Sequence, residues 1–115
     1  MKPQSAKAKG RRLQQWVRDE ILKHNPELNE DDVRSTSMGA GGEDVLLSQQ
    51  ARKFLPIQIE CKNKSKSAVH TMYQQTKDHG EHHPVLVIKQ DYDIPLVVID
   101  AEWFFELMRR LGGNI

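Results

Sequence analysis

The chain has 115 residues, of which 37% are hydrophobic and 29% charged, and its net charge is +1. That composition is typical of a soluble globular protein, and the length suits one domain, small enough for a homodimer to be unsurprising. No apolar run approaches the ~18 residues of a membrane span, and no apolar stretch follows the basic start MKPQSAKAKGRR, which argues against a signal peptide. The single cysteine excludes an internal disulfide and fits a reducing cytoplasm.

The charged residues are distributed unevenly along the chain. Basic residues crowd the amino-terminal end and the stretch from 52 to 66, whereas acidic residues gather at 27–32 and 100–106. Such asymmetry can steer a polyanion to one face, although solvated surface charge is the alternative interpretation. The basic residues are Lys2, Lys7, Lys9, Arg11 and Arg12, followed by Arg52, Lys53, Lys62, Lys64 and Lys66.

The first predicted helix starts at Gly10, after residues 1–9, which we expect to be a flexible basic arm preceding a single domain over residues 10–115. In RRLQQWVRDEILKH, apolar residues recur on one stripe at about 100° per residue, and Pro26 blocks continuation. Glu20 falls within the stripe, so its carboxylate needs a partner such as a metal cleft, unless its tip reaches solvent at the helix end. The stripe consists of Leu13, Trp16, Val17 and Ile21.

An acidic loop over residues 25–32 leads to a short predicted strand over residues 33–37. The glycines of the next turn, residues 38–42, allow the backbone to approach a ligand closely. The turn lacks the Gly-Lys-Ser/Thr ending of a nucleotide-binding loop, so that interpretation is rejected.

Two strand-like runs follow, DVLLS from Asp44 and PIQIECK ending at Lys62. Side chains alternate between the faces of a strand, so Gln58, Glu60 and Lys62 share a polar face. If the runs pair as a hairpin joined by SQQARKFL, Asp44 and Glu60 lie side by side. Adjacent carboxylates repel unless a cation lies between them, and oxygen-only ligands favour Mg²⁺ or Mn²⁺. With the positive charge of Lys62, the three residues suit hydrolysis of a phosphodiester.

The rest of the chain predicts further helices and strands. We expect a helix over residues 68–79, buried strands over 84–89 and 95–100 joined by the turn QDYD, and a final helix, AEWFFELMRRL, capped by Asp100 and ending at Gly112. A strand, a helix and a strand in succession predict a right-handed parallel crossover. The order αβββαβ(β)α therefore predicts an α/β fold, a mixed sheet flanked by helices.

Other reactive residues give weaker signals. His79, His82 and His83 lie in the polar stretch KDHGEHHP, which supplies no cysteine or second ligand pair, so a zinc site is disfavoured. Cys61 is predicted to face inward as a buried thiol, with no histidine placed to activate it.

The motif residues resemble the PD-(D/E)XK nuclease superfamily, whose signature is an Asp and, after a variable spacer, Glu-x-Lys on an adjoining strand. The two halves here are Glu43-Asp44, without the proline, and Glu60-Cys61-Lys62. Within the superfamily the chain looks most like the small archaeal-type and phage-type Holliday junction resolvases. The residues that follow their order and spacing are Lys9-Gly10, Val33-Arg34-Ser35, Asp44 and Ile59-Glu60-Cys61-Lys62.

This resemblance implies a restriction-endonuclease-like fold with an αβββαβ core, an extra strand and a carboxyl-terminal helix. It implies Mg²⁺, with Mn²⁺ as a substitute, bound by Asp44, Glu60 and the backbone carbonyl of Cys61, with Lys62 in the catalytic set. The implied activity is the resolution of four-way DNA junctions by paired nicks. The implied enzyme is a homodimer that does not bind a membrane. It would act in the cytoplasm, which is the host cytoplasm if a phage encodes the chain. DNA contacts are expected at Lys9, Arg11, Arg12, Arg34, Ser35, Lys64 and Lys66.

The resemblance fails at one position. Related nucleases often place a metal-assisting Glu on the first helix, and the matching residue here is Gln14. The role falls either to Glu20, which we include in the catalytic set, or to a glutamine. A nuclease of nicking or restriction type, and a DNA-binding module that no longer cleaves, are the alternatives. The presence of Asp44, Glu60 and Lys62 favours an enzyme.

Overall fold

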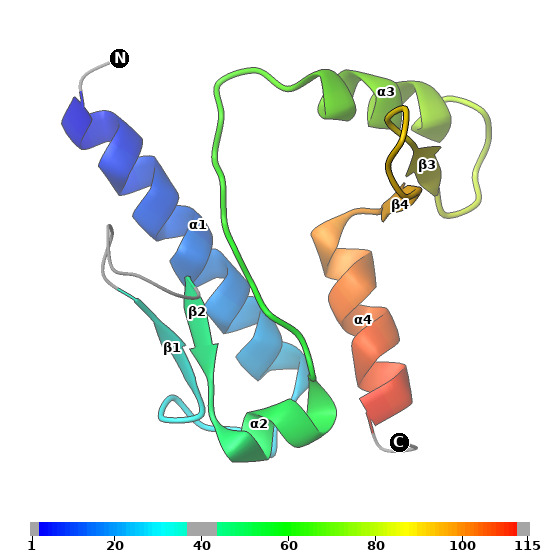
Figure 1. The fold of residues 1–115 in the computed structure, drawn as a ribbon. Coiled ribbons are helices and arrows are strands. Elements are labelled where there is room, and N and C mark those ends of the chain that lie inside the picture. The colour runs from blue at the N-terminus through cyan, green and yellow to red at the C-terminus, as the bar shows by residue number, and fades with distance from the viewer. Residues whose placement is uncertain (1–2, 37–43, 113–115) are drawn as a thin grey trace. The chain divides into compact units, whose positions relative to one another are not determined.

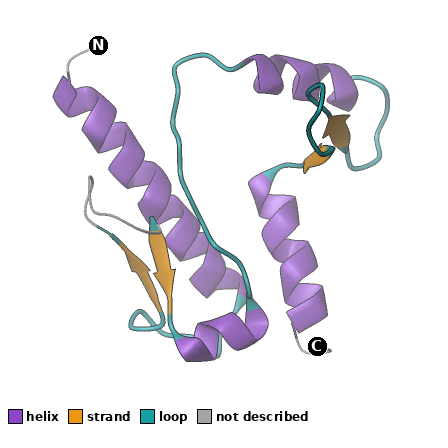
Figure 2. Cartoon of the chain, in the orientation of Figure 1, coloured by secondary structure: helices purple, strands orange, loops and turns teal. Residues whose placement is uncertain are grey.

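The computed structural model describes residues 3–36 and 44–112, which form a mixed α/β structure (Figure 1). Most of the regular structure is helical, and the described strands are short and lie in two antiparallel pairs (Figure 2). The helices are α1 (Pro3–His24), α2 (Gln49–Phe54), α3 (Ala68–Lys77) and α4 (Ala101–Gly112). The strands are β1 (Val33–Ser35), β2 (Val45–Leu47), β3 (Leu86–Ile88) and β4 (Leu96–Val98).

The chain divides into two compact units. The first unit comprises Met1–Asn63 and Phe105–Ile115, and so contains α1, β1, β2, α2 and most of α4. The second unit, Lys64–Phe104, contains α3, β3, β4 and the first turn of α4. Within residues 3–36 and 44–112, none of the helices combines the length and the apolar character needed to cross a membrane.

Helix α1 begins at Pro3, so residues 3–9, predicted to be part of a flexible arm, belong to the helix. Proline is tolerated in the first turn of a helix because its missing N–H would have no intrahelical partner there. The alanines and lysines that follow are good helix formers, which offsets the cost of about 1 kcal/mol for Gly10 inside a helix.

The apolar stripe of α1 is largely as predicted. Val17 and Ile21 are buried, but Trp16 is 41% exposed and lies at the edge of the stripe. The helix ends where Asn25 donates both its backbone N–H and its side-chain Nδ2 to the carbonyl of Ile21, at 3.0 and 2.8 Å. Pro26 follows and cannot continue the backbone ladder.

The core of the first unit lies between α1 and the antiparallel pair of β1 and β2. Val33 pairs with Leu47 and Ser35 with Val45. Because side chains alternate along a strand, Val45 and Leu47 at the two ends of β2 point into the core, while Leu46 between them is 47% exposed. The buried apolar residues are Val17, Ile21, Leu28, Val33, Val45, Leu47, Ala51, Leu55 and Phe105.

The segment SQQARKFL, predicted as a hairpin connection, contains the short helix α2. Ser48 caps the helix, since its Oγ accepts the backbone N–H of Ala51 at 3.0 Å, and the same Oγ donates to Asp32 at 2.7 Å. The backbone N–H of Asn29, followed by the hydroxyl of Ser48, lowers the pKa of Asp32. A serine that suits a helix start thus also ties α2 to the loop before β1.

In the second unit, β3 and β4 form an antiparallel hairpin in which Val87 pairs with Val97. The turn QDYD was predicted correctly: Asp93 donates its N–H to the carbonyl of Gln90 at 3.1 Å, and Tyr92 adopts a positive φ of 64°. The predicted parallel crossover is wrong, because within the described residues β3 pairs only with β4. A tight turn between adjacent strands favours antiparallel pairing, since it closes a shorter loop than a crossover requires.

Asp100 caps α4, as the sequence predicted. Its Oδ1 accepts the N–H of Trp103 at 2.7 Å. The phenol of Tyr73, on α3, donates to Asp100 Oδ2 at 3.3 Å and accepts the Asp100 N–H at 3.2 Å. Removal from solvent raises the pKa of Tyr73. The imidazole of His83, considered above as a weak zinc candidate, stacks on the indole of Trp103 with ring centroids 3.6 Å apart.

The Ser48 cap gives a first prediction. Ser48→Ala removes both the acceptor for Ala51 and the donor to Asp32, and should lower the free energy of unfolding by about 1 kcal/mol. The folded-state pKa of Asp32 is lowered, so its contribution to stability is present above the ordinary carboxyl pKa and is lost as the pH falls through the folded value. The difference between wild type and variant should therefore shrink in acid.

Urea denaturation followed by circular dichroism would measure this effect at several pH values. Ser65→Ala, at an exposed loop position, is the matched control. Equal stability of the wild type and Ser48→Ala at neutral pH would contradict the capping role.

Candidate functional site

Asp44 is held in place by hydrogen bonds from two other segments. Its carbonyl accepts the backbone N–H of Thr36 at 3.0 Å and the Thr36 hydroxyl at 3.1 Å. Its own N–H donates to the carbonyl of Ile59 at 3.0 Å, and its Oδ2 accepts the backbone N–H of Cys61 at 2.5 Å. These bonds hold Asp44 against the backbone on either side of Glu60, although residues 55–63 form no regular strand.

The predicted alternation along residues 57–62 is present in the structure. The apolar residues of this segment are half-buried, whereas Gln58, Glu60 and Lys62 are exposed. Lys62 Nζ lies 3.3 Å from Glu60 Oε1, and their side chains are 72% and 71% exposed. Glu60 and Lys62 therefore project together from the exposed side of this segment.

The pKa of the Cys61 thiol depends on the charges around it. Burial raises the pKa of Cys61, and the negative charges of Asp44 and then Glu60 raise it further. Two carboxylates from different parts of the chain thus act on one thiol. A raised pKa keeps the thiol protonated at neutral pH, so Cys61 is a poor nucleophile.

Gln14, on α1, reaches β1, the strand that pairs with the one after Asp44. It is 3% exposed, and its Oε1 accepts the hydroxyl of Ser35 at 3.0 Å. Ser35 pairs with Val45, the neighbour of Asp44 in the sequence. The hydroxyl of Ser35, expected to contact DNA, is directed to Gln14 in this structure.

Glu20 faces inward as predicted, but its neighbours differ from those expected. Its side chain is 13% exposed, and its carboxylate lies 3.4 Å from His24 Nε2 and 3.9 Å from Lys23 Nζ. The other nitrogen of His24, Nδ1, lies 3.5 Å from Glu106 Oε2 on α4. Six residues along a helix correspond to about 9 Å, so Glu20 lies well along α1 from Gln14. Glu20 therefore lies with His24, and Gln14 lies beside β1, the strand that pairs with the one after Asp44.

The residues expected to contact DNA have varied environments. Arg11, Arg12, Lys64 and Lys66 are exposed, whereas Lys9 is half-buried. The exposed Arg34 lies 3.5 Å from Asp31. Lys64 and Lys66 belong to the second unit. The glycine-rich turn and Glu43 of the motif lie outside the described residues.

Sequence reasoning missed Thr36, Ser35 as the partner of Gln14, and His24. Thr36 follows the strand in which Ser35 was singled out, but only the register of β1 and β2 shows that it reaches the backbone of Asp44. His24 lies one turn after Glu20 on α1, and that i,i+4 spacing is a signal that the sequence contains.

Comparison of the chain with models of protein families, with curated proteins and with solved structures gives no match. The candidate site is defined by its own residues: Asp44 bonds to the backbone of the segment on which Glu60 and Lys62 pair.

The action of both carboxylates on the Cys61 thiol gives a second prediction. Asp44→Asn and Glu60→Gln each remove one negative charge near the thiol, so each should lower the pKa of Cys61 toward its ordinary value. The pH dependence of alkylation of the single cysteine measures that pKa directly. Asp31→Asn, at an exposed carboxylate, is the control. A thiol pKa that stays the same in both motif variants would show that the carboxylates do not act on the thiol.

Proposed function

We propose that the protein is a metal-dependent DNA endonuclease of the PD-(D/E)XK type, with a restriction-endonuclease-like core, that acts on branched DNA. The observation that carries the proposal is the bond from the Cys61 N–H to Asp44 Oδ2, which holds one carboxylate against the segment bearing Glu60 and Lys62. A binding surface alone would not need two carboxylates beside a phosphate, because they repel it. A hydrolytic site needs them to hold a cation.

The donor set fits a hard divalent cation. Asp44, Glu60 and the backbone carbonyl of Cys61 offer only oxygen, which suits Mg²⁺ or Mn²⁺, and both carboxylates act on the same thiol. A cation bound there would neutralise a phosphate oxygen and lower the pKa of a water molecule. Because a carboxylate has two oxygens, Asp44 can accept the Cys61 N–H with one while ligating with the other.

The protein's own residues would then orient and stabilise the reacting phosphate. The four hydrogen bonds of Asp44 fix its position before substrate binds, so little reorganisation is needed in the reaction. Lys62, beside Glu60 and open to solvent, can donate to an oxygen on which negative charge develops. On the first helix, either Glu20, which lies beside His24, or Gln14, which accepts the Ser35 hydroxyl, would fill the metal-assisting role.

Four-way junctions are the proposed substrate. A junction is two-fold symmetric, so paired cleavage needs two equivalent sites, which a C₂ homodimer of this chain would provide. Each chain supplies one set of Asp44, Glu60 and Lys62.

A second candidate is a DNA-binding module that does not cleave. The observation that favours it is the buried Gln14, which stands where related nucleases often have a carboxylate. A nuclease of nicking or restriction type is a further alternative within the enzyme class.

The proposed metal site gives a third prediction. Calorimetric titration should show that the wild type binds Mg²⁺, Mn²⁺ and Ca²⁺, and that the double variant Asp44→Asn with Glu60→Gln does not bind them. In a cleavage assay, Ca²⁺ should support cleavage poorly. A double variant at the exposed carboxylates Glu30 and Asp31 should bind as the wild type does. Undiminished binding in the motif variant would place the metal elsewhere.

The fourth prediction separates chemistry from binding. Lys62→Ala should lower the cleavage rate on the order of 10²-fold, because a group acting on developing charge typically contributes that much. DNA affinity should change far less, since other basic residues contact the phosphates. Lys53→Ala, at an exposed lysine outside the motif, should cleave at the wild-type rate.

One gel with labelled junction, flap, single-stranded and linear duplex DNA tests both the rate and the substrate, with and without Mg²⁺. We expect paired nicks in opposing strands of the junction. Equal cutting of linear duplex would favour the nicking or restriction-type enzyme. Tight junction binding without cutting in Mg²⁺ or Mn²⁺ would favour the binding module.

A further inference from the structure

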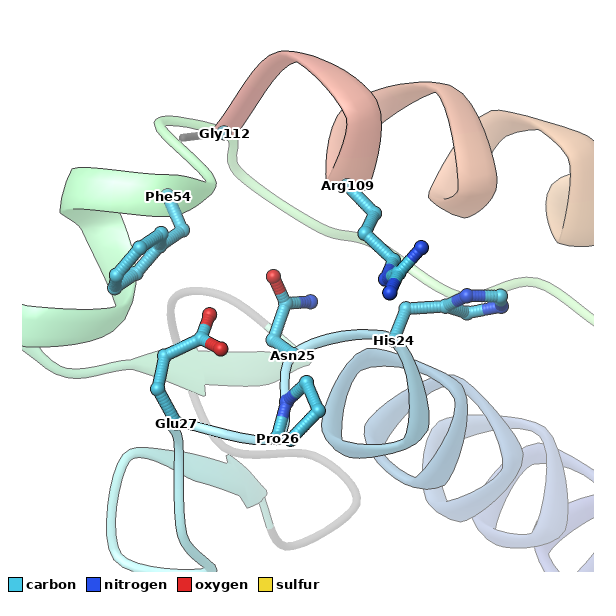
Figure 3. Close-up of a pocket in the computed structure, with 7 residues that line it drawn as sticks. All are labelled: His24, Asn25, Pro26, Glu27, Phe54, Arg109 and Gly112. Carbon is cyan, nitrogen blue, oxygen red and sulfur yellow. The ribbon is translucent and has the colours of Figure 1, made fainter. Parts of the chain in front are cut away.

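A pocket of about 370 Å³ lies in the first unit, where the end of α1, the end of α2 and the last turns of α4 meet (Figure 3). Its volume is at the lower end of the range for small-molecule sites. The residues that determine its chemistry are His24, Asn25, Glu27, Phe54 and Arg109. None of them belongs to the proposed catalytic set.

Opposite charges lie on opposite sides of this pocket. The ring of Phe54 and the carboxylate of Glu27 lie on one side, and the guanidinium of Arg109 lies beside His24 on the other (Figure 3). Among the described ion pairs, the carboxylates of Glu20 and Glu106 are engaged with His24, Lys23 and Arg110, and Arg109 has no carboxylate partner. Its cation is therefore available to an anionic ligand.

Asn25 supplies a fixed acceptor between the two sides. It is 4% exposed, and its Nδ2 donates to the carbonyl of Ile21 at 2.8 Å, which sets the orientation of the amide. The amide oxygen is directed toward the space between Phe54 and Arg109 (Figure 3). A buried amide held in one orientation is a group that can select a ligand donor.

These groups together define the ligand. It must present a flat ring to Phe54, hydrogen-bond donors to Glu27 and Asn25, and an anion to Arg109 across the pocket. An α-amino acid does not satisfy this pattern, because its ammonium and carboxylate are adjacent. A nucleotide does, since its base and its phosphate lie at opposite ends.

We propose that this pocket binds a guanine nucleotide. The Watson–Crick edge of guanine carries two neighbouring donors, N1–H and N2–H, which match the two oxygens of Glu27. Adenine and cytosine place a ring acceptor beside their amino group, and that acceptor would repel the carboxylate. Phe54 would stack on the base and Arg109 would bind the phosphate.

The inference does not rest on the proposed nuclease activity, because it uses none of the same residues. The guanine could come from a free mononucleotide or from an unpaired base in DNA, which share the recognised chemistry. The experiment therefore uses GMP and a hairpin oligonucleotide with one unpaired guanine. AMP and the same hairpin with an unpaired adenine are the matched ligands.

Calorimetric titration of the full chain should show that GMP, or the unpaired guanine, binds about tenfold or more tightly than its adenine counterpart. Glu27→Gln should remove that preference. Phe54→Leu should weaken the binding of guanine and adenine ligands alike, by about tenfold. Arg109→Gln should weaken the binding of GMP but not that of guanosine, because guanosine has no phosphate. Glu30→Gln, at an exposed carboxylate of the same loop, is the control, and denaturation midpoints check that each variant folds.

Guanine-selective binding that depends on Glu27, with either ligand, would support the proposal and identify the source. Absence of binding with both ligands at millimolar concentration would overturn it. Equal affinity for guanine and adenine, or a guanine preference that survives in Glu27→Gln, would overturn it as well.

Discussion

The hydrogen bonds of Asp44 are the interaction on which the candidate site depends. Residues 55–63 belong to no regular strand, and in the segment that carries Glu60 and Lys62 the carbonyl of Ile59 and the N–H of Cys61 are both bonded to Asp44. Buried backbone groups need such partners, because leaving one without a hydrogen bond costs free energy. The carboxylate proposed to ligate a metal therefore also positions the segment that would supply the second ligand.

A second set of contacts joins α1 to α4. His24 lies between Glu20 and Glu106, and the buried Phe105 precedes Glu106 on α4. Removing charges from water is costly, so such a cluster contributes more to a defined arrangement than to net stability. It also keeps nearby carboxylates occupied, which leaves Arg109 to face the pocket at the ends of these helices.

The second unit is formed by contacts that are close in sequence. A tight turn closes β3 against β4, and Tyr73 links α3 to the cap of α4. The strands are apolar on both faces, a pattern typical of strands buried between layers, yet Val87 is 61% and Val97 64% exposed. Local pairing accounts for the hairpin. None of the described residues buries the face of the hairpin that carries Val87 and Val97.

The sequence alone determined what local chemistry fixes: the apolar stripe of α1, the alternation from Ile57 to Lys62, and the Asp100 cap. Each follows from the period of a helix or strand, or from a side chain bonding to its own neighbourhood. It also indicated that Asp44 lies near the segment that carries Glu60. Only the tertiary structure decided that Gln14 rather than Glu20 lies beside the strands, and that β3 pairs with β4 instead of entering a parallel sheet. Those outcomes depend on strand register and on which distant segments meet, and both are set by the sum of many weak contacts that no short pattern in the chain records.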